Sequence, residues 1–183
     1  MKNAVWLFSF LSLVICSPSF GQQEPSQLNK VVIIRHAEKP ESGDNLSCQG
    51  LNRSLQLPEV LKNKFGTPDF IFVPAVNTGK NTSTARMYQT IVPFAVKYNL
   101  TIDSKYNVDD TKDLAREILN KSGSVLVVWE HSHIDNIAKA LGVQNVSKWP
   151  GNDFDSIWII DFENGKATLK KDAEGIHPAA NCK

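Results

Sequence analysis

The chain has 183 residues, which is enough for one domain with a substantial hydrophobic core. It is 42% hydrophobic and 21% charged, as is usual for a globular protein. The formal net charge is +1, so no overall positive field would draw the protein to nucleic acid or to an acidic membrane. Any binding of anions must therefore come from a local cluster of cations.

The first residues have the pattern of an export signal. Lys2 supplies a positive charge, and residues 4–15 form an apolar stretch that is too short for an ordinary membrane span. Residues 19–21, Ser-Phe-Gly, place small residues at the two positions that a signal peptidase reads. We therefore expect residues 1–21 to be a signal peptide that is cleaved before Gln22.

Residues 22–183 are then expected to form one mature domain that is periplasmic or secreted. Two alternatives remain open for the start of the chain: an uncleaved anchor, or lipidation at Cys16. No later run is long and apolar enough to cross a bilayer, so we expect no stable membrane insertion after cleavage.

Export also affects the interpretation of the cysteines. Cys48 and Cys182 would be the two that remain in the mature chain, an even count in an oxidising compartment. We predict a disulfide that ties the C-terminal tail to the segment after the first strand. Two free thiols are the alternative.

The first half of the chain predicts two strands and two helices. Residues 31–34, Val-Val-Ile-Ile, indicate a strand over residues 30–35 that is buried on both faces. Ser47 is a suitable N-cap for a following helix, which Pro58 is expected to kink or restart. A strand at residues 70–73 and a helix over about residues 83–98 come next.

The second half predicts two helices, a strand and a hairpin. The helices are expected at residues 110–121 and 134–141, with a strongly apolar strand at residues 125–129 between them. Asn164-Gly165 between residues 157–162 and 167–169 is a strong hairpin signal. The alternation of strands and helices predicts an α/β fold with a mostly parallel sheet, helices on both faces, and a C-terminal hairpin at one edge.

Residues suited to catalysis follow the ends of two predicted strands. Arg35 ends the first strand and His36 follows it, and Glu130 and His131 come after the strand at residues 125–129. Arg86 lies near the start of the helix after the second strand. Because ligands of open α/β sheets bind beyond the carboxyl ends of the strands, we expect these five side chains to share one site.

These residue types suit the transfer of a phosphoryl group. Two guanidiniums can neutralise a phosphate monoester dianion, and a neutral imidazole can attack phosphorus and carry the group covalently. A second imidazole could stabilise the phosphoryl oxygens, and a carboxyl group could protonate the leaving oxygen. This chemistry predicts a small phosphorylated substrate and requires no metal or other cofactor. Each residue alone could have a structural role, and the prediction depends on their convergence.

The same segments resemble the histidine phosphatase superfamily, which includes the cofactor-dependent phosphoglycerate mutases and many phosphatases. Arg-His-Ala-Glu at residues 35–38 looks like the family's first motif, and Arg86 with Gln89 and Thr90 looks like its second. The strand that ends in Trp-Glu-His at residues 129–131 looks like the segment that carries its second histidine. The resemblance covers roughly residues 30–162 and implies a three-layer α/β sandwich. It also implies that His36 is the nucleophile and that Arg35, Arg86 and His131 form the phosphate pocket.

Two departures from the family pattern bear on the chemistry. Ala37 stands where a glycine usually follows the first histidine. Glu130 precedes the second histidine, where glycine is frequent, and this position makes Glu130 our preferred proton donor, as in the subset of the family with tryptophan-glutamate-histidine. Both Glu130 and His131 can serve the site only if the strand has already ended before them.

Other carboxylates remain open as the proton donor. Many members of the family take the acid from the stretch after the second arginine, where Asp109 and Asp110 lie. Glu38 is a weaker candidate. Trp149 and Phe154 could line the mouth of the site or could equally belong to the core.

Two other functions compete with a phosphatase. His131, His133 and Asp135 match the start of the H-x-H-x-D-H pattern of zinc hydrolases, although Asn136 replaces its last histidine. The chain could also be a periplasmic module that binds a phosphate ligand without turnover. A mutase is less favoured, because the chain is short and export would separate it from glycolytic substrates.

Overall fold

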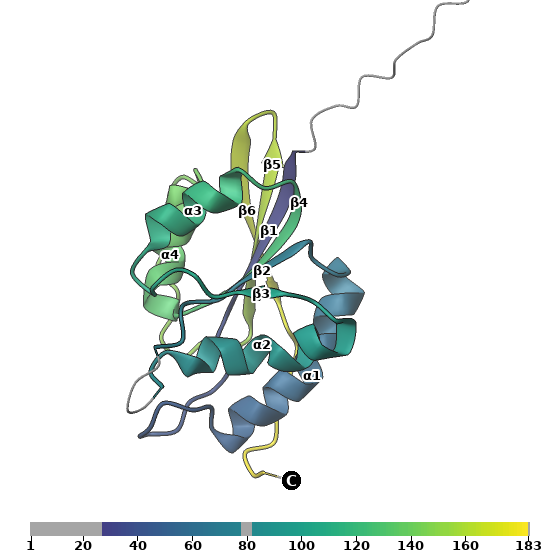
Figure 1. Cartoon of the computed structure of the whole chain (residues 1–183), viewed down its shortest axis with the longest axis vertical. Helices are drawn as coiled ribbons and strands as arrows, with labels where there is room; N and C mark the ends of the chain where they lie inside the picture. The colour runs from purple at the N-terminus through teal and green to yellow at the C-terminus, as the bar shows by residue number, and fades with distance from the viewer. Residues whose placement is uncertain (1–26, 78–81, 183) are drawn as a thin grey trace, which may run out of the picture.

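The computed structural model describes residues 27–77 and 82–182; the predicted signal peptide, its cleavage site and Cys16 lie outside these residues. The described chain forms one sheet with four helices (Figure 1). In chain order the elements are β1 (Leu28–Arg35), α1 (Cys48–Phe65), β2 (Phe70–Phe72), α2 (Ala85–Tyr98), β3 (Ile102–Asp103), α3 (Thr111–Leu119), β4 (Gly123–Trp129), α4 (His131–Ala140), β5 (Ser156–Glu163) and β6 (Lys166–Ala173).

The sheet has six strands in the order β3-β2-β4-β1-β5-β6. The first four strands in this order run parallel, and β5 pairs antiparallel with both β1 and β6. The predicted mostly parallel sheet with a hairpin at its edge is therefore confirmed. The sequence did not predict β3, because two residues are too few to show a strand pattern.

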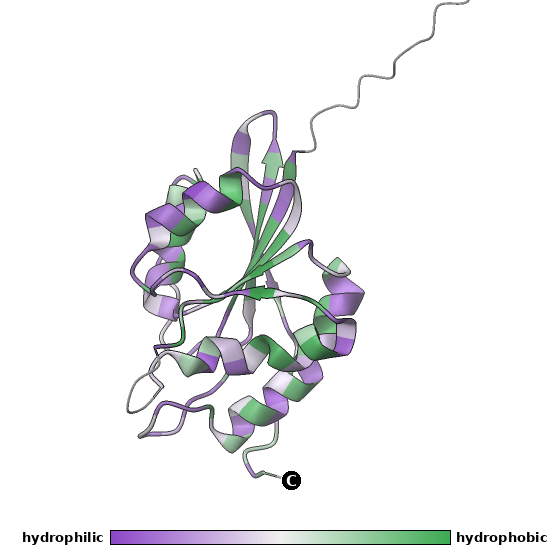
Figure 2. Cartoon of the chain, in the orientation of Figure 1, coloured by the Kyte–Doolittle hydropathy of each residue, from purple (hydrophilic) through white to green (hydrophobic). Residues whose placement is uncertain are grey.

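Each face of the sheet carries its own hydrophobic core. Val31 and Ile33 of β1 pack into the core under α3 and α4, while Val32 and Ile34 pack into the core under α1 and α2. Alternate residues of a strand point to opposite faces, so an unbroken apolar run is what a strand buried on both sides requires. Figure 2 shows the hydrophobic colour concentrated along the central strands, between helices of mixed character. The result is the expected three-layer sandwich.

The helices differ from the sequence prediction at three points. α1 runs on through Pro58 rather than restarting there; Pro58 is buried in the helix, so its packing offsets the hydrogen bond that it cannot donate. α2 begins at Ala85 after Thr84, which has a positive φ of 60°. α4 begins at His131, whereas the sequence predicted residue 134. The first turn is polar and shows no apolar periodicity, so the sequence pattern did not reveal the start of the helix.

The β5–β6 hairpin turns where the sequence predicts. Asn164 and Gly165 have φ values of 51° and 73°, so both occupy the left-handed region that a two-residue turn of this kind requires. Within the described residues, we find no helix with the length and hydropathy needed to cross a membrane.

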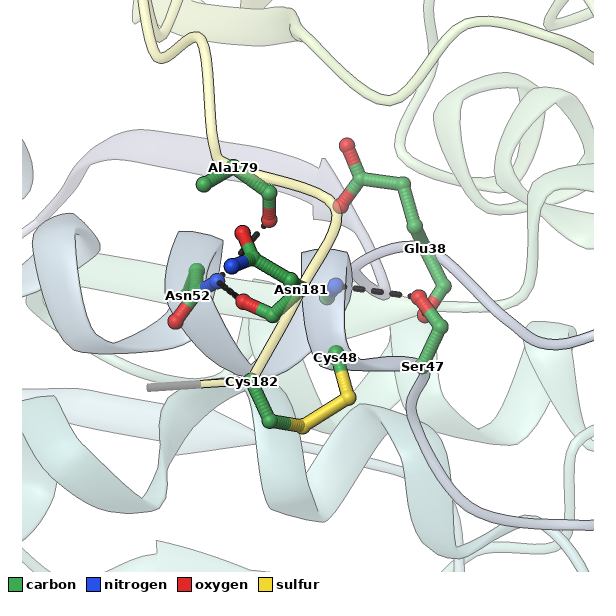
Figure 3. The surroundings of a disulfide bond; sticks show 8 residues. Glu38, Ser47, Cys48, Asn52, Ala179, Asn181 and Cys182 are labelled. Carbon is green, nitrogen blue, oxygen red and sulfur yellow. Dashed lines mark hydrogen bonds between the residues drawn. A yellow bond between two sulfur atoms is a disulfide. The ribbon is translucent and has the colours of Figure 1, made fainter.

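The predicted disulfide is present and joins the start of α1 to the C-terminal tail (Figure 3). Cys48 and Cys182 are separated by 134 positions, and their Cα atoms lie 4.7 Å apart. The side-chain amide of Asn52 donates hydrogen bonds to the carbonyl oxygens of Ala179 and Asn181, both at 2.8 Å. The tail is therefore held along the first turns of α1.

We predict that replacing both cysteines with serine lowers the free energy of unfolding by about 3–5 kcal/mol, because the bridge closes a long loop and restricts the unfolded chain. Urea unfolding of the mature protein measures the change. Reduction of the wild-type protein is the matched control and should produce the same loss, and a double variant as stable as the wild type would contradict the prediction.

Candidate active site

The ends of β1 and β4 lie side by side at the carboxyl edge of the sheet. Arg35 is in register with Trp129, and the backbone N–H of His36 donates to the Trp129 carbonyl at 3.1 Å. β4 ends at Trp129, and Glu130 is the N-cap of α4. Glu130 and His131 therefore lie beyond the strand, and their side chains need not point to opposite faces of the sheet. Nδ1 of His131 lies 2.7 Å from Oε1 of Glu130.

Arg35 is a buried cation at this edge, with only 2% of its surface exposed. Its Nη1 donates to the carbonyl oxygens of Gly151 and Asp153 at 2.8 and 3.1 Å, and its guanidinium carbon lies 3.8 Å from the centre of the Phe154 ring. Burial lowers the pKa of Arg35 to about 10, although Glu130, Asp153 and Glu38 act in the opposite direction. The group thus remains protonated at neutral pH, and its Nε, also buried, has no hydrogen-bond partner among the described residues.

His36 is a buried imidazole that is held in one orientation. Its Nδ1 lies 2.7 Å from the carbonyl oxygen of Ala37. Since a carbonyl oxygen only accepts, Nδ1 carries the hydrogen and Nε2 keeps its lone pair. Burial, together with the positive charges of Arg35 and Arg86, lowers the pKa of His36 to about 4, although the hydrogen bond to Ala37 and the charge of Glu130 oppose this shift. His36 is consequently neutral at physiological pH.

Arg86 reaches this site from the first turn of α2. It donates from Nε to the carbonyl oxygen of Asn45 at 3.3 Å and from Nη2 to the carbonyl oxygen of Gly43. Its charge acts on His36, as described above, so the structure brings Arg35, His36 and Arg86 into one electrostatic environment.

Gln89 and Thr90 hold the loop that follows His36. The hydroxyl of Thr90 accepts from the N–H of Ala37 at 2.9 Å and donates to the carbonyl oxygen of Arg86 at 2.7 Å. Oε1 of Gln89 accepts from the N–H of Leu46 at 3.0 Å. Both residues belong to the sequence motif that begins at Arg86, and their spacing of three and four from Arg86 places them on one helix face, which is the signal for this role.

Ala37, which directly follows His36, fits the backbone without strain. It is fully buried, and it is not among the four described non-glycine residues with a positive φ. Its N–H is occupied by Thr90. A glycine is therefore not needed here for conformational reasons.

Burial and neighbouring charges control the protonation of His131 and Glu130. Burial lowers the pKa of His131, and the positive charge of Arg35 adds to the effect despite the opposing charge of Glu130. Burial alone would raise the pKa of Glu130, but hydrogen bonds from Ser132 and His133 and the charge of His131 outweigh it and lower the pKa. The close contact of His131 Nδ1 with Glu130 is not aligned as a hydrogen bond.

The four carboxylates considered as proton donors have different surroundings. Asp109 joins the same network as Glu130, because its Oδ1 lies 2.8 Å from Nε2 of His133. Asp110 instead accepts hydrogen bonds from the backbone and side chain of Asn107. Glu38 turns away toward Arg53. Of the four, Glu130 alone lies against His131.

The segment before β5 covers one side of the site. The rings of His36 and Phe154 meet in an edge-to-face arrangement, with 6.0 Å between the ring centres, and Phe154 also stacks on Arg35. Trp149 belongs to the hydrophobic core, where it packs against Trp158 with ring centres 5.1 Å apart. Of the two aromatic residues left open by the sequence, Phe154 therefore lies at the site and Trp149 does not.

A buried ionic cluster anchors the His36 loop from behind. Arg53 of α1 donates to Glu38 at 2.8 Å and to Glu174 at 2.6 Å, and also contacts Asp155 at 3.3 Å. The carbonyl oxygen of Glu38 accepts from the N–H of Ser47, the N-cap of α1 (Figure 3). The cluster joins the loop, α1 and the end of β6, and no pattern in the sequence predicts it.

The zinc-hydrolase residues do not form a metal site. Asp135 is buried and pairs with Lys139 at 2.7 Å, while both ring nitrogens of His133 face carboxylates. Across residues 27–77 and 82–182, no group of three or more His, Cys, Asp or Glu side chains is arranged to hold a metal ion.

Comparisons with solved structures identify the fold. Residues across most of the chain superpose on SixA of Agrobacterium tumefaciens, with a TM-score of 0.57, 18% identity, and coverage of 82% of this chain and 98% of SixA. A protein histidine phosphatase SixA bound to tungstate gives a TM-score of 0.59 at 16% identity, with coverage of 79% of this chain and 97% of that protein. The mycobacterial glucosyl-3-phosphoglycerate phosphatase Rv2419c bound to inorganic phosphate gives a TM-score of 0.55 at 14% identity, with coverage of 83% of this chain and 98% of that protein.

The sequence itself matches no family model and no curated protein. The structural likeness extends over nearly the full length of each of these three neighbours. At these low identities it shows that the chain has the fold of the histidine phosphatases, and the resemblance noted from the sequence motifs is confirmed at that level.

We predict that Glu174→Gln changes how stability depends on pH. Burial raises the pKa of Glu174 to about 8 in the folded protein, above the ordinary value of 4.5. The folded state therefore holds a proton that the unfolded state releases, so this carboxyl makes the free energy of unfolding fall as pH rises between about 4.5 and 8.

The variant should resemble the wild type near pH 5 and should gain on it by more than about 1 kcal/mol by pH 8.5. Urea unfolding of both proteins at the two pH values measures the difference. A difference in stability that stays constant with pH would contradict the prediction.

Proposed function

We propose that the protein is a phosphatase that hydrolyses a phosphate monoester through a phosphohistidine intermediate on His36, without a metal ion. The observation that carries this proposal is the state of His36, which is a buried, neutral imidazole whose Nε2 keeps its lone pair and which lies under the influence of two arginines. A nucleophile that is neutral at physiological pH needs no general base to activate it.

In the first step, Nε2 of His36 attacks phosphorus in line with the ester oxygen. The P–Nε2 bond forms as the P–O bond to the leaving group breaks. The carboxyl group of Glu130 gives its proton to the departing oxygen and becomes a carboxylate, so the alcohol leaves neutral. The phosphoryl group is then held on His36.

In the second step, water attacks the phosphohistidine. Glu130 accepts a proton from the attacking water as the new P–O bond forms and the P–Nε2 bond breaks. Inorganic phosphate leaves, His36 returns to its neutral form, and Glu130 is again a carboxylic acid. The carboxyl group thus serves as acid and then as base within one cycle.

Arg35, Arg86 and His131 are the proposed phosphate-binding groups. The buried Nε–H of Arg35 makes no hydrogen bond to the described residues, and a phosphate oxygen would satisfy it. Two structural neighbours were solved with tungstate and with inorganic phosphate, which supports an anionic ligand for this fold. The proposed partner is accordingly a small phosphorylated substrate.

We also propose that the mature domain, residues 22–183, acts in the periplasm or outside the cell. The Cys48–Cys182 disulfide supports this location, because disulfides persist in oxidising compartments. The apolar segment at residues 4–15 supports export.

We predict that His36→Ala lowers the rate of phosphate-ester hydrolysis by more than about 10³-fold, because the variant lacks the side chain that is proposed to carry the phosphoryl group. A panel of aryl and alkyl phosphates measures the loss. Acid-labile phosphate should be trapped on a histidine of the wild-type protein after a rapid quench. His177→Ala is the matched control, since His177 is exposed in the C-terminal tail, and it should retain wild-type activity.

Trapping on serine or cysteine would overturn the assignment of the nucleophile. A protein that binds phosphate but hydrolyses no ester between pH 4 and 8 would be the non-catalytic binding module instead.

We further predict that vanadate or tungstate inhibits the enzyme while EDTA leaves its activity unchanged. Both oxyanions would occupy the proposed pocket as mimics of a phosphoryl group, and the proposed reaction uses only side chains. Inhibition constants and rates after dialysis against EDTA test this. Loss of activity in EDTA that zinc restores would favour the zinc hydrolase built on His131, His133 and Asp135.

A further inference from the structure

We propose that His133 is a positioning residue that shares one proton with Glu130 and so prepares Glu130 to act as the general acid, while Asp109 holds the His133 ring. This inference rests on the proposed phosphatase function and adds a role for a histidine outside the phosphate pocket.

The His133 imidazole lies between two carboxylates from different parts of the chain. Its Nδ1 is 2.7 Å from Oε2 of Glu130, at the start of the same helix. Its Nε2 is 2.8 Å from Oδ1 of Asp109, in the turn before α3. Ser132 also contacts Glu130 through its hydroxyl group. The three residues Asp109, His133 and Glu130 form a hydrogen-bonded chain that ends beside His131.

The two carboxylates restrict where the protons can lie. Asp109 is 82% exposed, and as a carboxylate it only accepts, so Nε2 of His133 carries a hydrogen. The 2.7 Å contact between Nδ1 and Glu130 then needs one more proton. That proton lies either on Nδ1, giving an imidazolium and a carboxylate, or on Oε2, giving a neutral imidazole and a carboxylic acid. The two states differ only by a transfer along one hydrogen bond.

This sharing solves a difficulty in the proposed reaction. The hydrogen bonds and charges around Glu130 lower its pKa, so the carboxylate is the favoured form in the free protein. The first step nevertheless requires a carboxylic acid. A phosphate dianion in the pocket would repel a neighbouring carboxylate and favour the state in which Glu130 holds the shared proton.

The proton count stays balanced through the cycle. His133 gives its Nδ1 proton to Glu130 as substrate binds, and Glu130 gives that proton to the leaving oxygen. Glu130 recovers a proton from the attacking water, and the proton returns to Nδ1 of His133 when phosphate leaves. No proton from solvent is needed to prepare the acid.

The test compares esters that differ in their need for an acid. An alkyl phosphate has a poor leaving group and requires protonation, whereas 2,4-dinitrophenyl phosphate leaves readily as an anion. His133→Asn keeps an amide that can donate to Glu130 but has no proton to transfer. We expect it to slow alkyl phosphate hydrolysis by about 10–100-fold while changing dinitrophenyl phosphate hydrolysis less than about 3-fold.

A double-mutant cycle with Glu130→Gln shows whether His133 affects the rate of hydrolysis through Glu130 or independently of it. Glu130→Gln alone should show the same selectivity for alkyl esters, and adding His133→Asn to it should cause little further loss. Equal slowing of both esters by His133→Asn, or no slowing of either, would overturn the proposal.

A second measurement does not depend on turnover. The ¹³C signal of the Glu130 carboxyl group reports its titration in the free protein. Asp109→Asn should move that titration in the wild-type background and should no longer move it when His133 is Asn. If Asp109→Asn leaves the titration of Glu130 unchanged, the proposed coupling of Asp109, His133 and Glu130 is wrong. If the wild-type protein hydrolyses neither ester, the phosphatase proposal fails, and this measurement still decides whether His133 and Glu130 share a proton.

Discussion

The backbone pairing of β1 with β4 is the constraint on which the candidate site depends. It aligns Arg35 with Trp129, so the two strands end at the same level. His36 and the pair Glu130-His131 therefore follow the strands side by side. Both strands are buried on both faces, and a shift in register would disrupt the two cores at once. The packing that stabilises the sheet therefore also determines the distance between residues 90 positions or more apart.

Concentrating positive charge at this edge has an energetic cost that the surrounding structure offsets. Arg35 is almost fully buried, and burying a cation without partners would be strongly unfavourable. The carbonyl oxygens of Gly151 and Asp153 and the ring of Phe154 stabilise one side of its guanidinium. Behind the His36 loop, the ion pair of Arg53 with Glu38 and the hydrogen bond of Arg53 to Glu174 hold the backbone that carries the imidazole. The same arrangement keeps His36 neutral, because desolvation and nearby cations both oppose its protonation.

The sequence predicted the sheet and the histidine-bearing strand ends because these depend on local patterns. The apolar runs of β1 and β4 and the Asn164-Gly165 turn are short-range signals, and the structure confirms them. Contacts set by tertiary packing could not be predicted in this way. Arg53 and Glu174 lie 121 positions apart and meet only because α1 and the end of β6 pack together. The polar first turn of α4, which contains His133, lacks the apolar spacing from which a helix start is recognised.

That polar first turn explains why one short segment can supply so many groups. The strand ends at Trp129 and the helix starts at His131, so the alternation of the strand stops and residues 130, 131 and 133 can face the same region. Glu130 is thereby positioned by the sheet itself, beside the second histidine. The exposed carboxylate of Asp109 lies on the far side of His133, 2.8 Å from its Nε2. Glu130 and the Asp109–His133 contact are consequently parts of one arrangement, in which the end of the strand positions the proposed acid and the first turn of the helix positions the histidine that would share its proton.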